Sequence, residues 1–172
     1  MATMAFYITL FLLLLASSAI ATVEEVCKTA SQDPEIKYDF CVSSLKAAPG
    51  SATADNQGLA VIAGTLTANQ AKSIKSKVDS LLKSATDAKV RECLSTCQEA
   101  FDDAISDAED GTTAAKEKQL EDAKAKFSAV IDAPSTCEDG FKEFHLQSPL
   151  TQDGDTLEEL AAIALSIISG LN

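Results

Sequence analysis

Four long segments of this chain place apolar residues three or four positions apart, the spacing of one face of an α-helix. The segments run from about 55 to 83, from 87 to 109, from 112 to 132 and from 155 to 170. Each has one apolar face, so packing the four helices antiparallel would bury all four faces. The chain has no Trp and only four prolines, and good helix formers fill its middle. We therefore predict an all-α fold, an up-and-down four-helix bundle.

The ends of these helices are predicted from local cap residues. Gly111 should end the second helix, because glycine accepts the left-handed conformation of a helix end. Ser135, with Glu138 three positions later, has the pattern of a capping box and should begin a short separate helix. Asp155 with Glu158 has the same pattern and should begin the fourth long helix.

The first 21 residues have the pattern of a signal peptide. Residues 6–16 are almost entirely apolar, and the small residues of Ala19-Ile20-Ala21 suit cleavage after Ala21. The apolar run is short for a membrane span, which needs about 20 residues; a retained anchor is the alternative. The secreted domain would then cover residues 22–172, with a helical hairpin in residues 22–50 and the bundle in residues 51–172.

Five cysteines are placed where disulfides could hold such a fold together. They are Cys27, Cys41, Cys93, Cys97 and Cys137. Cys27 and Cys41 flank two short helical patterns, which alone are too small to fold. In a secreted chain a disulfide between them is the expected staple. Closing a loop of about 15 residues contributes about 3 kcal/mol in the chain-entropy model.

Cys137 needs a partner in the second long segment. Cys97 lies on the apolar face of that segment, so we favour a Cys97–Cys137 disulfide, with Cys93–Cys137 as the alternative. Cys93 and Cys97 should not bond each other, because positions four apart on a helix suit disulfide geometry poorly. In the favoured pairing Cys93 is a free thiol. A zinc site at Cys93 and Cys97 would need more ligands, and His145 is the only histidine, so we expect no metal and no cofactor.

The charge balance limits the possible partners. The chain has 14 basic and 26 acidic side chains and a net charge of −12. Such a surface repels nucleic acid and anionic lipid, and it favours a basic protein partner or simply keeps the protein in solution. Catalysis is also not expected, because His145 has no recognisable nucleophile partner and adjacent carboxylates on a helix point about 100° apart.

Several motifs, taken in order along the chain, are more specific than any one of them alone. They are "KTASQDPEIKYDF" between Cys27 and Cys41, "SATAD" at 51–55 followed by "GLAVIA", "QEAFDDA" after Cys97, "TCEDGFKE" at 136–143, "SPLT" at 148–151 and "LAAIALSI" at 160–167. This set resembles the plant invertase and pectin methylesterase inhibitors over nearly all of the mature chain. The combination is most similar to a subgroup of invertase-inhibitor-like pollen proteins that includes allergens.

The resemblance implies a fold and a function. It implies an N-terminal helical hairpin on a four-helix bundle, with disulfides Cys27–Cys41 and Cys97–Cys137 and Cys93 as an extra thiol. It also implies a non-enzymatic protein that is secreted to the apoplast (cell wall). There it would inhibit an invertase (beta-fructofuranosidase) in a 1:1 complex, as a monomer or weak dimer, without a membrane or nucleic-acid partner. Pectin methylesterase is the alternative target.

One motif of the family is missing. Some invertase inhibitors carry a Pro-Lys-Phe tripeptide after the second bundle helix, and it enters the invertase active site. Residues 110–127 here contain no such tripeptide. Only the last two residues match, in "AKF" at 125–127, and Phe127 falls on the predicted buried face. The sequence therefore does not decide between the two target enzymes.

An inhibitor of pectin methylesterase would cover the enzyme's cleft with a helical face, and exposed polar residues of the first two long helices are candidates for it. They are Thr67, Lys72, Lys75, Asp79, Gln98, Asp102 and Asp103. A third hypothesis is a non-inhibitory pollen protein that binds a small ligand. It needs a cavity, which the small residues Ala60, Ala63 and Gly64 could leave, although close helix packing is the commoner reason for such residues.

Overall fold

The structure, a computed structural model, describes residues 22–171 of the chain. Within that range all regular elements are helical. They are α2 (Val23–Ala30), α3 (Tyr38–Ala47), the short 3-10 helix η1 (Ser51–Thr53), α4 (Asn56–Ser84), α5 (Ala88–Lys116), α6 (Leu120–Glu143) and α7 (Thr151–Ser169). The predicted all-α fold is confirmed.

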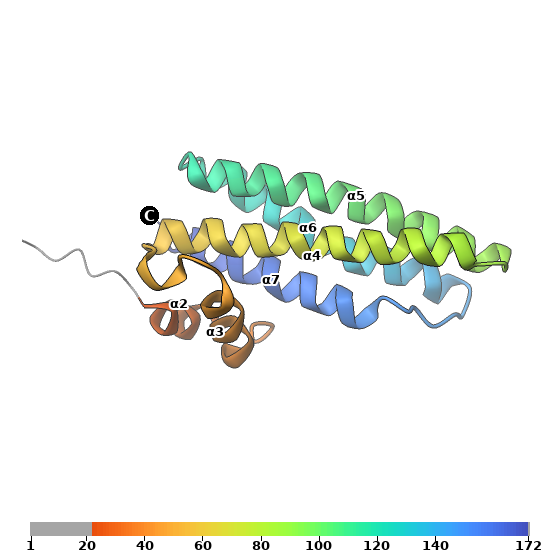
Figure 1. The fold of residues 1–172 in the computed structure, drawn as a ribbon, viewed down its shortest axis with the longest axis horizontal. Coiled ribbons are helices and arrows are strands. Elements are labelled where there is room, and N and C mark those ends of the chain that lie inside the picture. The colour runs from red at the N-terminus through yellow and green to blue at the C-terminus, as the bar shows by residue number, and fades with distance from the viewer. Residues whose placement is uncertain (1–21, 172) are drawn as a thin grey trace, which may run out of the picture.

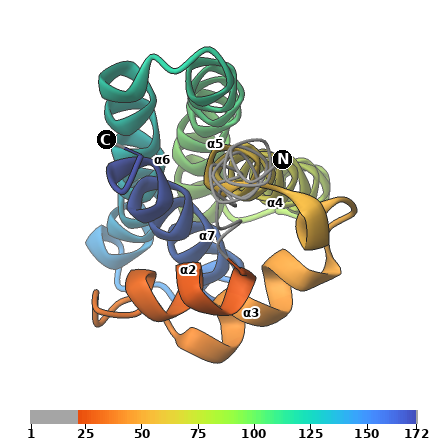
Figure 2. The same cartoon turned by 90° about the vertical axis from the view of Figure 1, so that its left-hand side faces the viewer.

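The four long helices form one up-and-down bundle (Figure 1). Helix α5 packs against α4 and α6, and α7 closes the ring against α6 and α4 (Figure 2). The connections are short, at residues 85–87, 117–119 and 144–150, so consecutive helices run antiparallel. Three phenylalanines, Phe101, Phe127 and Phe141, are the largest of the fully buried side chains. Burying each contributes about 1.5–3 kcal/mol.

The predicted end of the second helix at Gly111 is wrong. Helix α5 continues through Gly111 to Lys116. A Cβ at position 111 would lie 3.0 Å from Phe127 Cε2 and 3.0 Å from Lys126 Cβ on α6. The glycine therefore lets α5 and α6 approach closely inside the bundle, a packing role that its neighbours in sequence do not reveal.

The short separate helix predicted at Ser135 is also wrong. Helix α6 runs unbroken through Pro134, and the Ser135 hydroxyl donates to the carbonyl of Asp132 in the preceding turn. A proline inside a helix normally disturbs it. Here the ring is buried against α7, where a Cβ at Gly154 would lie 3.1 Å from Pro134 Cβ. Local sequence rules predict that a helix ends before a proline. In this structure α6 continues through Pro134, and the buried proline packs against α7.

Helix α7 begins at Thr151, four residues before the predicted cap at Asp155. Its first turn is held by the preceding loop and by α4. The Leu150 N–H donates to Ser148 Oγ at 3.1 Å. The Lys77 ammonium of α4 donates to the Pro149 carbonyl at 2.9 Å and to the Asp153 carboxylate at 2.6 Å.

Two helices of the bundle end in a residue with positive φ that is not glycine. Lys118 follows α5 with φ of 62°, and His145 follows α6 with φ of 56°. The N–H of Gln119 donates to the Ala114 carbonyl, and that of Leu146 donates to the Phe141 carbonyl. These are Schellman motifs, in which the left-handed position is normally filled by glycine.

The hairpin of α2 and α3 lies along α7 and the start of α4 (Figure 1). Its helices are bridged by Cys27–Cys41, with a Cα–Cα distance of 5.7 Å. Thr22 and Glu25 form a reciprocal capping box at the start of α2. The predicted signal peptide falls on residues 1–21, outside the described residues, and remains a prediction. In the part of the chain that is described, no helix combines the length and apolarity needed to cross a membrane.

Candidate partner-binding face

A connected set of polar side chains lies between α4 and α5. Lys75 of α4 places its ammonium 3.2 Å from Asp79 Oδ2, one turn along the same helix, and 3.6 Å from Asp102 Oδ1 of α5. Gln98 of α5 donates to Asp79 Oδ1 at 2.6 Å. Lys72 pairs with Glu109 at 2.5 Å further along the two helices. Four predicted partner residues thus meet in one network, and we call this surface the α4–α5 face.

The network fixes the charge state of its members. The hydrogen bond from Gln98, reinforced by Lys75, lowers the pKa of Asp79 below its ordinary value. The hydrogen bond to Asp79, with the added charge of Asp102, raises the pKa of Lys75. Both shifts favour the ionised pair, so its contribution to stability is lost as the pH falls through the lowered pKa of Asp79 and, at the alkaline end, as the pH rises through the raised pKa of Lys75.

Thr67 does not belong to this face, and its prediction as an exposed residue is wrong. Its side chain is fully buried, and its hydroxyl donates to the Ala63 carbonyl one turn earlier at 2.9 Å. A threonine can point into a core because this local bond satisfies its hydroxyl. Asp103 lies on the exposed side of α5 and has no ion pair within residues 22–171.

Glu92 and Glu99, which sequence reasoning missed, lie beside the α4–α5 face along α5, together with the predicted Asp103. Between Glu92 and Asp110 the chain has seven carboxylates and no Lys or Arg. Glu92, Glu99 and Asp103 are exposed and have no ion pair in the described chain. Their separations of seven and four residues place them along one side of the helix. A charge run with helical spacing and no base was the signal that could have revealed this acidic ridge.

The same face has a basic end. A shallow depression between the last turn of α4 and the first turns of α5 is lined by Asp79, Leu82, Lys83, Arg91 and Gln98. Arg91 donates to the carbonyls of Leu82 and Ala85, which would otherwise be left open at the end of α4. The face therefore has charged groups of both signs along its length, a pattern suited to recognising another charged protein surface.

The cysteines brace the helix that carries this face. Cys97 and Cys137 form a disulfide between α5 and α6 with a Cα–Cα distance of 4.4 Å. Cys93 is a buried free thiol whose Sγ lies 3.2 Å from the Gly140 carbonyl oxygen. Burial raises the pKa of the Cys93 thiol, which keeps it protonated and poorly nucleophilic. In the described residues no group of three or more His, Cys, Asp or Glu side chains could hold a metal ion.

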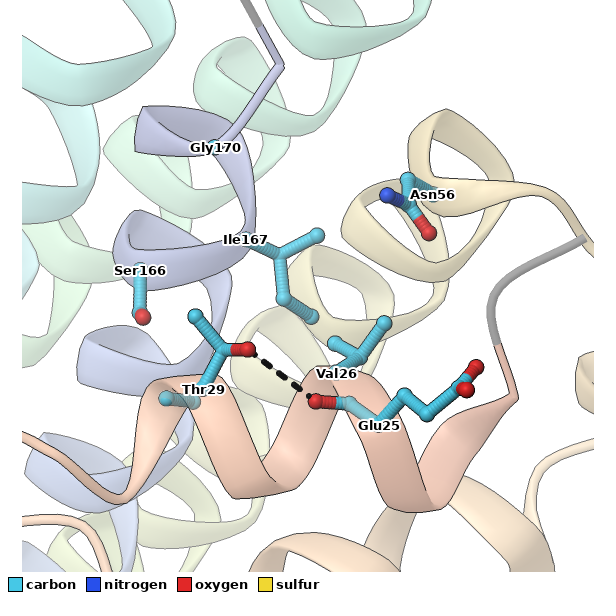
Figure 3. Close-up of a pocket in the computed structure, with 8 residues that line it drawn as sticks. Glu25, Val26, Thr29, Asn56, Ser166, Ile167 and Gly170 are labelled. Atoms are coloured by element: carbon cyan, nitrogen blue, oxygen red, sulfur yellow. Dashed lines mark hydrogen bonds between the residues drawn. The ribbon is translucent and has the colours of Figure 1, made fainter. Parts of the chain in front are cut away.

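The cavity required by the small-ligand hypothesis is not present beside Gly64. A Cβ there would collide with Thr112 and would lie 2.7 Å from Phe127 Cζ. Ala60 and Ala63 are fully buried as well, so the small residues serve close packing of α4 against its neighbours. A hollow of about 270 Å³ lies elsewhere, between α2, the start of α4 and the end of α7. Figure 3 shows polar and apolar side chains mixed around it, including Glu25, Val26, Asn56 and Ile167.

Phe127, the end of the partial tripeptide match, is unavailable to a partner. Its ring is fully buried in the bundle. Lys126, beside it, bridges Asp107 at 2.7 Å and Asp110 at 3.1 Å on α5. This region therefore offers no protruding Pro-Lys-Phe element.

Comparison with known proteins assigns the class. The profile of the family described as "Plant invertase/pectin methylesterase inhibitor" matches residues 21–167. A Platanus acerifolia protein provisionally named an invertase inhibitor is 38% identical over 164 residues, which are 94% of this chain and 92% of that protein. Pectinesterase inhibitor 12 of Arabidopsis thaliana is 32% identical over 157 residues, 90% of each chain.

The fold agrees with a solved member. The crystal structure of mutant form A of a pectin methylesterase inhibitor from Arabidopsis superposes with a TM-score of 0.73 at 21% identity, covering 88% of this chain and 99% of that one. Fold and disulfides define the class as a bridged helical bundle with an N-terminal hairpin. The chain belongs to the plant invertase/pectin methylesterase inhibitor family, whose members inhibit enzymes and are not enzymes themselves.

Proposed function

We propose that this protein is an invertase inhibitor-like protein of the plant cell wall that blocks its target by forming a one-to-one complex. The observation that carries the proposal is the 38% identity, across 94% of this chain, to the Platanus protein provisionally named an invertase inhibitor. Secretion through the signal peptide at residues 1–21, and a monomeric or weakly dimeric state, belong to the same proposal.

Pectin methylesterase is the second candidate target. The 32% identity to pectinesterase inhibitor 12 favours it. The buried position of Phe127 favours it too, because no Pro-Lys-Phe element is available to enter an invertase active site. For this target the α4–α5 face would cover the substrate cleft of the enzyme.

The α4–α5 face is the surface we assign to target binding. It is carried by two 29-residue helices. The disulfide Cys97–Cys137 ties one of them to α6, so the face is presented on a rigid support. Its unpaired carboxylates, with Lys83 and Arg91 at one end, would be matched by a target surface with the reverse order of charges. Such matching raises the association rate more than the affinity.

The deciding experiment titrates the oxidised protein, residues 22–172, against one plant acid invertase and one pectin methylesterase at about pH 5. Loss of invertase activity near one equivalent supports the main proposal. Loss of esterase activity alone moves the protein to the second target. Two fully active enzymes would contradict inhibition altogether.

Charge reversal tests the face. The double variant Asp102→Lys with Asp103→Lys should weaken inhibition about tenfold or more, because it places one cation beside Lys75 in the network and another in the acidic ridge. The matched control is Glu121→Lys with Asp122→Lys, an exposed acidic pair with the same charge change on α6. Equal loss in both variants would refute the assignment of the face.

The complex should also respond to pH. We expect binding to weaken as the pH rises from about 4.5 to 7.5, because carboxylates outside the matched patches gain charge on both proteins and repel one another. The dissociation constant, measured by calorimetry at both ends of the range, checks this. A constant that does not change with pH contradicts it.

A further inference from the structure

The N-terminal hairpin is cross-linked into one unit. The Cys27–Cys41 disulfide ties α2 to α3, and residues 48–55 connect the hairpin to α4. Figure 2 shows α2 and α3 outside the ring of four bundle helices, next to α7. The hairpin could leave this position without unfolding the ring, so the strength of its attachment is a separate property of the molecule.

One polar contact clasps the turn of the hairpin to α7. The backbone N–H of Lys37 donates to Glu159 Oε1 at 2.7 Å, and its ammonium donates to Glu159 Oε2 at 2.9 Å. The Glu159 residue is only 7% exposed. Its hydrogen bond and charge raise the pKa of Lys37, so the cation of the clasp persists above neutral pH. Ile36, beside the clasp, is buried and adds an apolar contact.

Carboxylates surround this clasp. They line a hollow of about 240 Å³ between the turn of the hairpin and α7. The lining residues are Asp33, Glu35, Lys37, Ile131, Asp155, Glu158, Glu159 and Ala162. Five of them are acidic, and Lys37 is the one cation that lines the hollow. Asp132 of α6 also acts on Glu158 through its charge. Like charges therefore face each other from the hairpin, α6 and α7.

The half-buried Glu158 is most affected by this arrangement. Burial raises its pKa, and the charges of Glu35, Asp155 and Asp132 raise it further. Glu35 sits on the hairpin, so the pKa should return toward its ordinary value when the hairpin leaves. A group whose pKa is raised in the docked state favours docking fully below its ordinary pKa, and this advantage is lost as the pH rises through the raised value.

We propose that this junction is a pH-responsive latch, in which the Lys37–Glu159 clasp holds the hairpin to α7 and carboxylate repulsion across the hollow loosens it. Acidic solution tightens the hairpin on the bundle, because protonation of Glu158 removes a charge facing Glu35, Asp155 and Asp132. Neutral solution restores that charge, and the hairpin opens more often. The latch does not depend on which enzyme the α4–α5 face binds.

Amide hydrogen exchange of the oxidised protein tests the latch. Exchange is followed by mass spectrometry at about pH 5 and about pH 7.5. Peptides from residues 23–47 are compared with peptides from residues 88–143 of the same molecule, which corrects for the pH dependence of intrinsic exchange. We expect hairpin opening, relative to the bundle, to be about fivefold more frequent at the higher pH. An unchanged ratio would overturn the proposal.

Two further arms identify the cause. Glu158→Gln keeps the size of the side chain and removes its charge, so the pH difference should largely disappear, whereas Glu99→Gln on α5 should retain it. In the unaltered protein, raising NaCl from about 20 mM to about 0.5 M at the higher pH should reduce opening, because salt screens the repulsion between the separated carboxylates more than the 2.9 Å contact between Lys37 and the buried Glu159. A full pH difference in Glu158→Gln, or opening that does not respond to salt, would overturn the latch.

Discussion

The helical glycines of this bundle differ in how much space surrounds them, and only the tertiary structure shows the difference. Gly64 of α4 lies against Phe127 and Thr112, so it has no room for a methyl group. Gly140 of α6 has room, since an added Cβ would meet nothing closer than 3.9 Å. Both look alike in the sequence as glycines inside helical patterns.

Gly64→Ala should lower the free energy of unfolding by about 1–3 kcal/mol, because overpacking against the fully buried Phe127 outweighs the gain in helix propensity. The matched variant Gly140→Ala should raise it by about 0.5–1 kcal/mol, since only the propensity changes. Urea unfolding of both variants measures the two effects. A neutral or stabilised Gly64→Ala would show that Phe127 can move aside.

For the helices, the sequence predicts the buried faces better than the residues at which each helix begins and ends. The apolar periodicity identified each bundle helix. The ends at Gly111, Ser135 and Asp155 were wrong, because tertiary contacts extend α5, α6 and α7 beyond their local cap signals. The actual end of α5 uses Lys118 in a conformation that favours glycine.

Replacing Lys118 with glycine should therefore stabilise the protein. Lys118→Gly relieves the left-handed strain at this Schellman position and should raise the free energy of unfolding by up to about 1 kcal/mol. The control is Lys116→Gly, two residues earlier and still helical, which should lower it by about 1 kcal/mol. Thermal unfolding of both variants separates the cases. Destabilisation by Lys118→Gly would mean that contacts of the Lys118 side chain stabilise the fold by more than the left-handed backbone conformation destabilises it.

For the whole molecule, the Cys97–Cys137 bridge ties together the two central helices of the chain. Its residues are 40 positions apart. Replacing both cysteines by alanine should lower the free energy of unfolding by about 4 kcal/mol in the chain-entropy model, since the unfolded chain regains its freedom. Cys93→Ala, which leaves the bridge intact, should cost no more than about 1 kcal/mol. Denaturant unfolding compares them, and a peptide map linking Cys93 to Cys137 would contradict the pairing.

The sequence alone determined the helical class, the number of long helices and the faces that they bury, because apolar spacing is a local and repetitive signal. It also placed Lys72, Asp102 and Asp103 correctly among the exposed polar residues, whereas Lys75, Asp79 and Gln98 are half-buried. Charge and spacing along a helix are enough to predict such a surface.

Only the tertiary structure decided how these parts fit together. In the folded chain Thr67 is buried and α6 continues through Pro134. Glu159 of α7 also contacts Lys37 of the hairpin, 122 positions away in sequence. Each outcome depends on atoms from a distant segment that fill space, satisfy a hydrogen bond or add a charge. Such contacts have no local signal, because their free energy exists only once the helices have packed.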